Sequence, residues 1–451
     1  MIKSNGQYAD FLGRKCCRQQ SVGFKPLWMP DWPFDFQEHL IDWGVRIGRG
    51  AIYADCGLGK GPMQLVWAEN MLRKWNRPVM IFAPLSVSHQ FVREGEKFGI
   101  EVKRTSGGEV HPGINVTNYE RMQKYDPSDF CAVSGDESGI IKHYDSKTRG
   151  LVTDFMERLD YRLLCTATPA PNDFMELGTS AEALGVMDRN RMLGMFFSHN
   201  GDNTQQWELK GHGKQAFWRW VAGWARALRK PSDLGFDDGD YDLPPLSIQK
   251  HEIITARKGR GFFNYAVTRD EQLVERRESL KARCEKVAEL VPKDRPCVIW
   301  CHLNDEGDLL EKLIPGAVQV AGRHSDDEKE ERLRAFGDGQ IRVLITKPKI
   351  GGWGLNWQHC SDVICFPTHS YEAFYQSVRR CWRFGQKRKV TVNVVLTEAE
   401  TPVMKNMMRK ERQTSEMFEG IVREMRDYQV VIYNRGDGFN KEIEVPLWIC
   451  P

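Results

Sequence analysis

The sequence predicts an α/β fold made of two consecutive units, each built on a parallel sheet. Short apolar runs, typical of strands buried on both faces, alternate with longer stretches of helical periodicity. This alternation occurs twice, and the polar segment GFDDGDYDLPPLS at 235–247 separates the two series as a linker. Strands that alternate with helices pair in parallel, so both units are expected to be parallel α/β.

The first unit is expected to span 34–234, after an N-terminal extension at 1–33. A helix beginning near Phe34 would carry Phe36, Leu40, Trp43 and Ile47 on one face. Buried strands are predicted where the apolar runs lie: 50–55, 78–84, 130–135 and 162–167.

The second unit is expected to span 248–400. A charged helix is predicted at 268–290, followed by strands at 297–302, 317–322, 342–347, 362–367 and 390–396. The tail, 401–451, reads as a helix and two short strands, 429–434 and 443–449, that pack on the second unit.

Composition narrows the class of protein. The 451 residues are 41% hydrophobic and 28% charged, as in globular proteins, and the net charge of +3 gives no global field for an acidic partner. We expect a cytoplasmic protein without a membrane segment, because no apolar run is long enough to span a bilayer. The twelve cysteines include no CxxC, which favours reduced thiols and gives no support for zinc.

The strongest local signal is GAIYADCGLGKG at 50–61, an apolar strand that enters a glycine-rich turn and then a helical pattern. In such a loop, backbone N–H groups around Gly57, Leu58 and Gly59 face phosphate oxygens, and Lys60 reaches the β and γ phosphates. The alternative is a glycine-rich turn without a ligand. Gly61 stands where a phosphate loop usually has the hydroxyl that binds Mg²⁺, so we expect nucleotide binding with weakened turnover.

A second signal is FCAVSGDESG at 130–139, an apolar strand that ends in Asp136 and Glu137. ATP hydrolysis needs one carboxylate for the metal and another for the attacking water, and these two residues would take those roles in that order. An acidic turn exposed to solvent is the alternative, and the preceding phosphate loop favours the catalytic interpretation. Gly135 adds backbone freedom where the carboxylates should be rigid.

Over about residues 34–400 these motifs resemble the helicase-superfamily-two ATPases, and within them the compact Swi/Snf-like translocases of phages and bacteria. Gln37 resembles the adenine-reading Q motif, and QSVRRCWRFGQ at 376–386 is similar to the pattern QAxxRxxRxGQ. The other segments that resemble family motifs, in chain order, are 54–61, 82–91, 116–122, 136–139, 166–172, 298–302, 321–336 and 351–357.

The resemblance implies two tandem RecA-like lobes, with ATP and Mg²⁺ in the cleft between them and nucleic acid, preferably double-stranded DNA, across both. It implies that Asp136 binds the metal and that Glu137, Gln376, Arg380 and Arg383 are catalytic. Thr166, Thr168, Gly354 and Asn356 would couple the ATP site to the nucleic acid. We also expect a monomer in the cytoplasm of a bacterium or a phage-infected cell.

The leading hypothesis is therefore an ATP-dependent translocase or helicase. The alternative is a nucleic-acid-binding regulator on the same fold that hydrolyses ATP poorly, which Gly61 and Gly135 motivate. An unrelated P-loop enzyme such as a kinase would not explain 351–357 or 376–386. The stretch AFWRWVAGWARALRK at 216–230 could stack on bases, but a packed helix with a basic outer face is the preferred interpretation.

Overall fold

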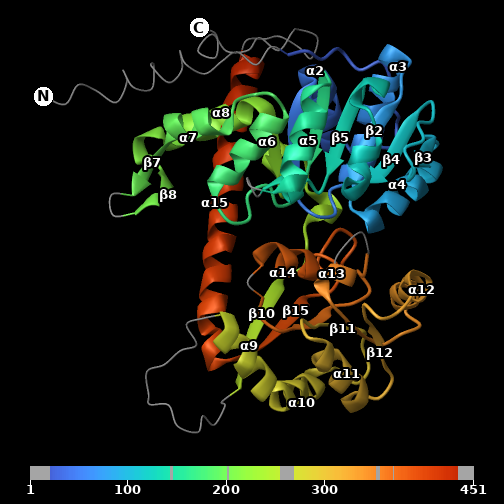
Figure 1. The fold of residues 1–451 in the computed structure, drawn as a ribbon, viewed down its shortest axis with the longest axis vertical. Helices are drawn as coiled ribbons and strands as arrows, with labels where there is room; N and C mark the ends of the chain where they lie inside the picture. Colours follow the sequence, from blue (N-terminus) through green and yellow to red (C-terminus); the bar gives the residue numbers. More distant parts are fainter. Residues whose placement is uncertain are drawn as a thin grey trace, which may run out of the picture. The chain divides into compact units, whose positions relative to one another are not determined.

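The computed structural model describes residues 21–142, 146–200, 203–253, 269–351, 356–368 and 370–434 (Figure 1). The chain divides into two compact units. The first, lobe 1, comprises Met1–Asp238 together with Gln413–Pro451, and the second, lobe 2, comprises Gly239–Arg412.

Lobe 1 is built on a seven-stranded sheet in the order β3-β4-β2-β5-β6-β1-β9, in which every pairing is parallel. Its strands are β1 (Arg49–Ala54), β2 (Val79–Ala83), β3 (Val102–Arg104), β4 (Ile114–Asn118), β5 (Ala132–Asp136), β6 (Tyr161–Cys165) and β9 (Ala225–Leu228). A separate antiparallel hairpin joins β7 (Phe197–Asn200) and β8 (Asn203–Leu209).

The helices of lobe 1 connect these strands as a parallel sheet requires. They are α2 (Asp35–Ile47), α3 (Lys60–Trp75), α4 (Leu85–Phe98), α5 (Lys147–Glu157), α6 (Leu177–Ala183), α7 (Arg189–Phe196) and α8 (Lys214–Trp224). Short 3₁₀ turns lie at Tyr119–Lys124, Pro127–Asp129, Ser138–Ile141, Phe174–Glu176, Gly211–Gly213 and Pro231–Leu234. Helix α3 packs against α2, α4 and β5, so it lies beside the strand that ends in Asp136.

Lobe 2 has a six-stranded sheet in the order β10-β15-β14-β11-β13-β12, also parallel throughout. Its strands are β10 (Leu246–Ile253), β11 (Cys297–Trp300), β12 (Ala317–Val320), β13 (Val343–Thr346), β14 (Asp362–Cys365) and β15 (Val390–Thr397). Its helices are α9 (Arg269–Glu278), α10 (Leu280–Leu290), α11 (Asn304–Leu313), α12 (Asp326–Gly337), α13 (Pro348–Gly351) and α14 (Tyr371–Val378), with 3₁₀ turns at Gly239–Tyr241 and Glu398–Glu400.

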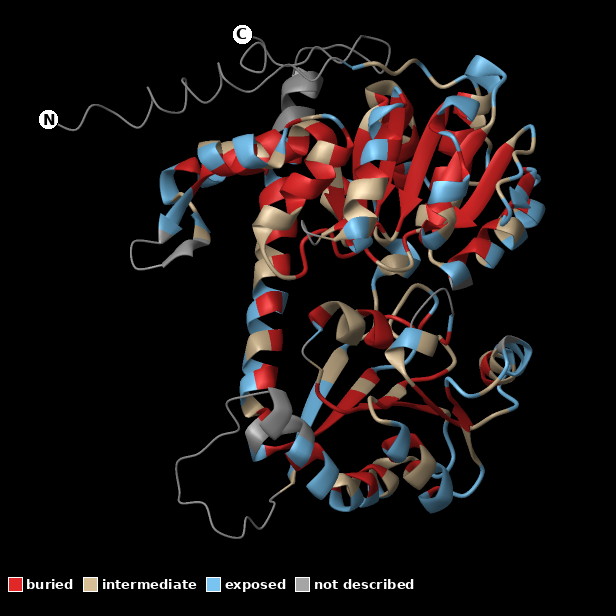
Figure 2. Ribbon diagram, viewed as in Figure 1, coloured by how far each residue is buried: buried red, intermediate tan, exposed pale blue. Residues whose placement is uncertain are grey.

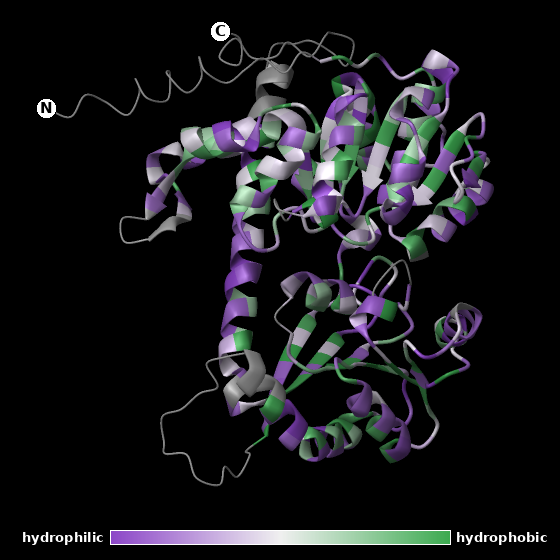
Figure 3. Cartoon of the chain, in the orientation of Figure 1, coloured by the Kyte–Doolittle hydropathy of each residue, from purple (hydrophilic) through white to green (hydrophobic). Residues whose placement is uncertain are grey.

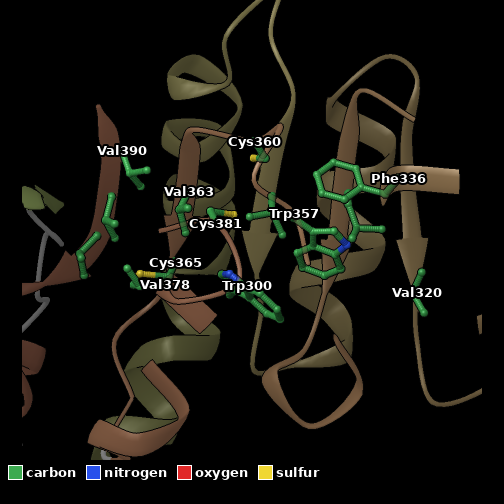
Figure 4. Close-up of a cluster of buried hydrophobic side chains, with 14 of the residues drawn as sticks. Trp300, Val320, Phe336, Trp357, Cys360, Val363, Cys365, Val378, Cys381 and Val390 are labelled. Carbon is green, nitrogen blue, oxygen red and sulfur yellow. The ribbon is translucent and has the colours of Figure 1, made fainter. Parts of the chain in front are cut away.

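The strands form the core of each lobe. Most of them, including β1, β2, β5 and β6 in lobe 1 and β11, β13, β14 and β15 in lobe 2, are buried along their length (Figure 2) and largely apolar (Figure 3), which is why continuous apolar runs marked them in the sequence. Strands β3 and β10 are exposed over much of their length. In lobe 2, Trp300, Phe336 and Trp357 pack together in one cluster, with the rings of Phe336 and Trp357 edge to face at 5.2 Å (Figure 4). The prediction of two parallel α/β units is confirmed.

The tail differs from the sequence prediction. Residues Thr401–Asn434 form one helix, α15, so the strand predicted at 429–434 is wrong, and the one predicted at 443–449 lies outside the described residues. The first three turns of α15 belong to lobe 2, and Val403, Met404 and Met407 are buried there. From Gln413 the helix belongs to lobe 1.

Two further predictions fail locally. The helix expected to continue through 216–230 ends at Trp224, because residues 225–228 pair with β1 as strand β9. The charged helix predicted at 268–290 is interrupted at Ser279, between α9 and α10.

Over the described part of the chain, no helix is both long enough and apolar enough to cross a bilayer. The nine cysteines described there carry free thiols.

Candidate nucleotide site

The carboxyl ends of β5, β6 and β1 lie next to one another in the sheet of lobe 1. Strand β1 leads into the glycine-rich loop, β5 ends at Asp136, and β6 is followed directly by Thr166. Parallel strands present their carboxyl ends at one edge, where open α/β sheets bind ligands. The structure therefore brings the two strongest sequence signals together.

The loop has the backbone of a phosphate-binding turn. Gly57 and Gly59 have φ values of +91° and +81°, in the left-handed region that favours glycine. Helix α3 begins at Lys60, so its N-terminus, with the positive end of the helix dipole, follows the loop directly. The Lys60 Nζ donates hydrogen bonds to the carbonyl oxygens of Ala54 (2.9 Å) and Asp55 (3.3 Å), which folds the ammonium group over the loop.

Gln37 holds the loop from helix α2. Its buried amide donates from Nε2 to the carbonyl of Leu58 at 3.0 Å, and its Oε1 accepts from the N–H of Phe34 at 3.1 Å. A Cβ on Gly59 would lie 2.3 Å from that Nε2, so a side chain at position 59 would displace the Gln37 amide. In this structure Gln37 positions the glycine-rich loop, and its contact with adenine stays a prediction.

Asp136 is buried at the end of β5 and faces helix α3. Its Oδ1 accepts a 2.8 Å hydrogen bond from Nε2 of Gln64, whose own Oε1 accepts from the Ser134 hydroxyl at 2.7 Å. Burial raises the pKa of the Asp136 carboxyl above its usual range, while the nearby Lys60 charge and the Gln64 hydrogen bond oppose that shift. A cation beside this carboxylate would therefore favour its ionised form.

Sequence reasoning missed Gln64. Gln64 lies four residues after Lys60 on α3, hence on the same face of the helix. This spacing is the sequence feature that could have identified Gln64 as a site residue.

Glu137 has a strained backbone. Its φ of +46° lies in the left-handed region that non-glycine residues seldom adopt, a feature that clusters at functional sites. The Oε2 of Glu137 lies 3.5 Å from the Thr166 hydroxyl, and the Tyr119 hydroxyl donates to the Asp136 carbonyl at 2.6 Å. The two carboxylates thus diverge, one toward α3 and the other toward the end of β6.

Gly135 has a packing reason. A Cβ there would lie 3.0 Å from the Tyr119 hydroxyl and 3.2 Å from Cδ2 of Leu164. The residue pairs with Phe82 on β2 and with Leu164 on β6, so the sheet constrains it on both sides. Gly135 therefore leaves room for Tyr119, whose hydroxyl donates to the Asp136 carbonyl. The glycine serves packing here and does not make the backbone flexible.

The predicted coupling residues of lobe 1 are also at this edge. Thr166 and Thr168 are buried, and the N–H of Thr168 donates to the Thr166 hydroxyl at 3.1 Å. The N–H of Thr166 reaches the Ile52 carbonyl on β1 at 3.3 Å. This turn therefore connects the strand before the phosphate loop to the strand beside the acidic pair.

In lobe 2, Gln376 lies on helix α14, and Arg380 and Arg383 lie in the turn after it. Gln376 and Arg380 are buried and Arg383 is half-buried. The Arg380 carbonyl accepts a 2.9 Å hydrogen bond from the N–H of Trp357, which anchors this turn to the segment that contains the exposed Asn356. Gly354 lies outside the described residues.

A lobe of this topology, with a glycine-rich loop before a helix and a divergent carboxylate pair at one sheet edge, has the fold of a RecA-like domain, a class in which such loops bind nucleotide phosphates. The second parallel α/β lobe gives the chain the two-lobed architecture that the motifs predicted.

Comparison with known proteins agrees with this class. Residues 282–385 match the family model described as "Helicase conserved C-terminal domain". The chain is 21% identical over 411 residues to "Putative protein p41" of Acyrthosiphon pisum secondary endosymbiont phage 1, covering 77% of this chain and 88% of that protein. It is 22% identical over 403 residues to "Putative ATP-dependent helicase/translocase YwqA" of Bacillus subtilis (strain 168), covering 80% of this chain and 43% of that protein.

These findings support a helicase-type ATPase of superfamily two.

Proposed function

We propose that the protein is an ATP-dependent nucleic-acid translocase or helicase that acts on double-stranded DNA. The observation that carries the proposal is the meeting of the phosphate loop with Asp136 and Glu137 at one edge of the lobe 1 sheet. The helicase domain match in lobe 2 and the name of the Bacillus relative support the family-level activity. The preference for double-stranded DNA rests on the Swi/Snf-like pattern of the motifs.

The residues of lobe 1 have the donors that an ATP site with Mg²⁺ needs. Lys60 would neutralise phosphate oxygens, the buried Asp136 carboxylate would hold the metal, and Glu137 would orient and deprotonate the attacking water. Bound Mg²⁺ would supply charge stabilisation at the β and γ phosphates. In nucleotide sites Mg²⁺ is usually held by one or two carboxylates together with phosphate oxygens and waters.

Lobe 2 would contribute the arginines. By resemblance to the family, Gln376, Arg380 and Arg383 act on the nucleotide when the cleft closes, because a guanidinium stabilises the charge of the transferring phosphoryl group. The further coupling residues Thr166, Thr168, Gly354 and Asn356 would transmit that closure to the bound DNA. We place this activity in the cytoplasm of a bacterium or a phage-infected cell, in a monomeric protein.

A second candidate is a nucleic-acid-binding regulator on the same fold that turns ATP over poorly. The observation that favours it is Gly61, which removes the hydroxyl of the standard phosphate loop. Both candidates bind nucleotide, and they differ in turnover.

The test is steady-state ATP hydrolysis with Mg²⁺, measured alone and with double-stranded DNA, single-stranded DNA or RNA. We expect double-stranded DNA to stimulate turnover, and higher salt to weaken that stimulation because contacts to phosphates dominate such binding. The variant Glu137→Gln should lose roughly 10²–10⁴-fold in turnover, the usual effect of removing a general base. Glu157→Gln, an exposed glutamate on α5 of the same lobe, is the matched control.

Stimulation by RNA alone would reassign the substrate. No hydrolysis under any condition, with ATP and DNA still bound, would support the regulator. Equal turnover in the wild type and in Glu137→Gln would refute the assigned role of Glu137.

A further inference from the structure

Position 61 in the first turn of α3 has an acidic neighbour from another helix. A Cβ built on Gly61 would lie 2.2 Å from Oε2 of Glu94, closer than such atoms approach in proteins, and 3.2 Å from its Cδ. Glu94 belongs to helix α4, which packs against α3. The carboxylate of Glu94 thus lies in the volume that a serine or threonine side chain would fill in a standard phosphate loop.

The carboxylate is held in this orientation. Gln90, one turn earlier on α4, donates from Nε2 to Oε1 of Glu94 at 2.6 Å. The other oxygen, Oε2, is the one nearest to Gly61. The charge of Glu94 also raises the pKa of Asp136, whereas Lys60 lowers it, so these three groups share one electrostatic environment.

A negative charge beside a phosphate loop needs an explanation. A carboxylate repels the phosphates of a metal-free nucleotide, whereas the usual hydroxyl is neutral. A divalent cation reverses the sign of that interaction, since Mg²⁺ in nucleotide sites is held by one or two carboxylates together with phosphate oxygens and waters. Glu94 and Asp136 provide those two carboxylates in lobe 1.

We propose that Glu94 replaces the phosphate-loop hydroxyl as the protein oxygen that holds Mg²⁺ beside Asp136, and that Gly61 provides the room for it. This inference rests on the proposed function, because it assumes that lobe 1 binds a nucleotide with Mg²⁺. It also gives the chain a specific property: nucleotide binding should depend on the metal more strongly than in a phosphate loop with a hydroxyl.

The test compares the affinity for a fluorescent ADP analogue in Mg²⁺ with that in EDTA. The ratio of the two affinities measures the metal's contribution without relying on turnover. We expect Glu94→Gln, which keeps the shape and removes the charge, to bind better than the wild type in EDTA. We also expect it to lose roughly tenfold to a hundredfold of the Mg²⁺ effect. Glu96→Gln, an exposed neighbour on α4, should behave as the wild type does, and Lys60→Ala should bind under neither condition.

Rescue distinguishes a metal role from a structural one. The double variant Gly61→Ser, Glu94→Gln restores a hydroxyl where the charge was removed and should regain most of the Mg²⁺ effect. Gly61→Ser alone should gain nothing, because its side chain displaces the Glu94 carboxylate. Circular dichroism of each variant establishes that it is folded.

Two outcomes would overturn the proposal while nucleotide binding stands: an unchanged Mg²⁺ effect in Glu94→Gln, or a double variant as defective as Glu94→Gln. Failure of the wild type to bind nucleotide under either condition would instead refute the proposed function, and this inference with it.

Discussion

His39, on the helix that carries Gln37, titrates far from its usual range. Burial and the nearby charge of Arg226 lower the pKa of His39 from 6.5 to about 4, and Asp42 opposes the shift. In the unfolded chain the imidazole binds a proton near its ordinary pKa, whereas the folded state excludes that proton. The contribution of His39 to stability is therefore fully present above about pH 6.5 and is lost as the pH falls toward 4.

This residue gives a pH-dependent prediction. Over that window the free energy of unfolding should fall, through His39 alone, by up to about 1.4 kcal/mol per pH unit. Urea unfolding of the wild type and of His39→Gln at several pH values measures the difference. The variant should show a shallower loss of stability on acidification, and parallel curves for the two proteins would contradict the assignment.

The site residues that could be predicted from the sequence are those inside contiguous motifs. Lys60, Asp136 and Glu137 could be found because a strand, a turn and a charged residue follow one another in the sequence. Gln64 and Glu94 were not found, because what they do depends on how α3 packs against β5 and α4. Nor could the packing reason for Gly135 be predicted, since Tyr119 is distant in the sequence.

At the scale of elements, the second part of α15 makes a close helix contact in lobe 1. Gly420 lies against the fully buried indole of Trp218, and a Cβ there would lie 2.8 Å from three ring atoms. Alanine normally stabilises a helix by up to about 1 kcal/mol relative to glycine. Overpacking a rigid core costs about 1–3 kcal/mol, and Trp218 has little room to shift.

Gly420→Ala should therefore destabilise lobe 1 by about 1 kcal/mol, although alanine has a higher helix propensity than glycine. Gly223→Ala in α8 is the matched control, because nothing lies within 4 Å of its added Cβ, and it should stabilise the lobe. Urea unfolding followed by tryptophan fluorescence measures both changes. If both variants were stabilised, the close contact of α15 with Trp218 would be refuted.

The sequence predicted elements well where they are buried on both faces. All five strands predicted in lobe 2 are present, because their apolar runs lie between helices. The strand at 225–228 was missed because the arginines and alanines there continue the helical spacing of α8, and only pairing with β1 makes this segment extended. The three-residue strand β3, with two exposed residues, had no apolar run to mark it.

For the whole molecule, lobe 1 is assembled from both ends of the described chain. Met417, Phe418, Ile421 and Met425 of α15 are buried in it, and the Met425 Sδ accepts a hydrogen bond from the N–H of Ala227 on β9. Ion pairs add to this, including Arg219 with Glu424 at 3.1 Å. The sequence placed the tail on lobe 2 because chain neighbours usually pack together, and no local pattern shows that a helix continues to a distant partner.

Lobe 1 should consequently depend on its C-terminal segment. Four buried apolar side chains contribute about 1.5–3 kcal/mol each, or roughly 6–12 kcal/mol as an upper estimate, which is comparable to the whole stability of a domain. A fragment ending at residue 238 should be largely unfolded in thermal and near-ultraviolet circular dichroism measurements. The fragment 239–412, which is continuous and contains both core clusters of lobe 2, should fold alone.

Adding the missing helix as a separate peptide tests whether the fragment 1–238 is unfolded because it lacks these contacts or because truncation disrupts it in another way. A peptide of residues 413–451, in excess, should restore a cooperative thermal transition to the fragment 1–238, because binding to the folded state alone raises its stability by mass action. The same peptide with Phe418→Asp and Ile421→Asp should not, since it would bury two unpaired charges. A fragment 1–238 that melts like the intact lobe without any peptide would show that α15 adds little to the stability of lobe 1. The four side chains would then be buried in lobe 1 without being needed for its folding.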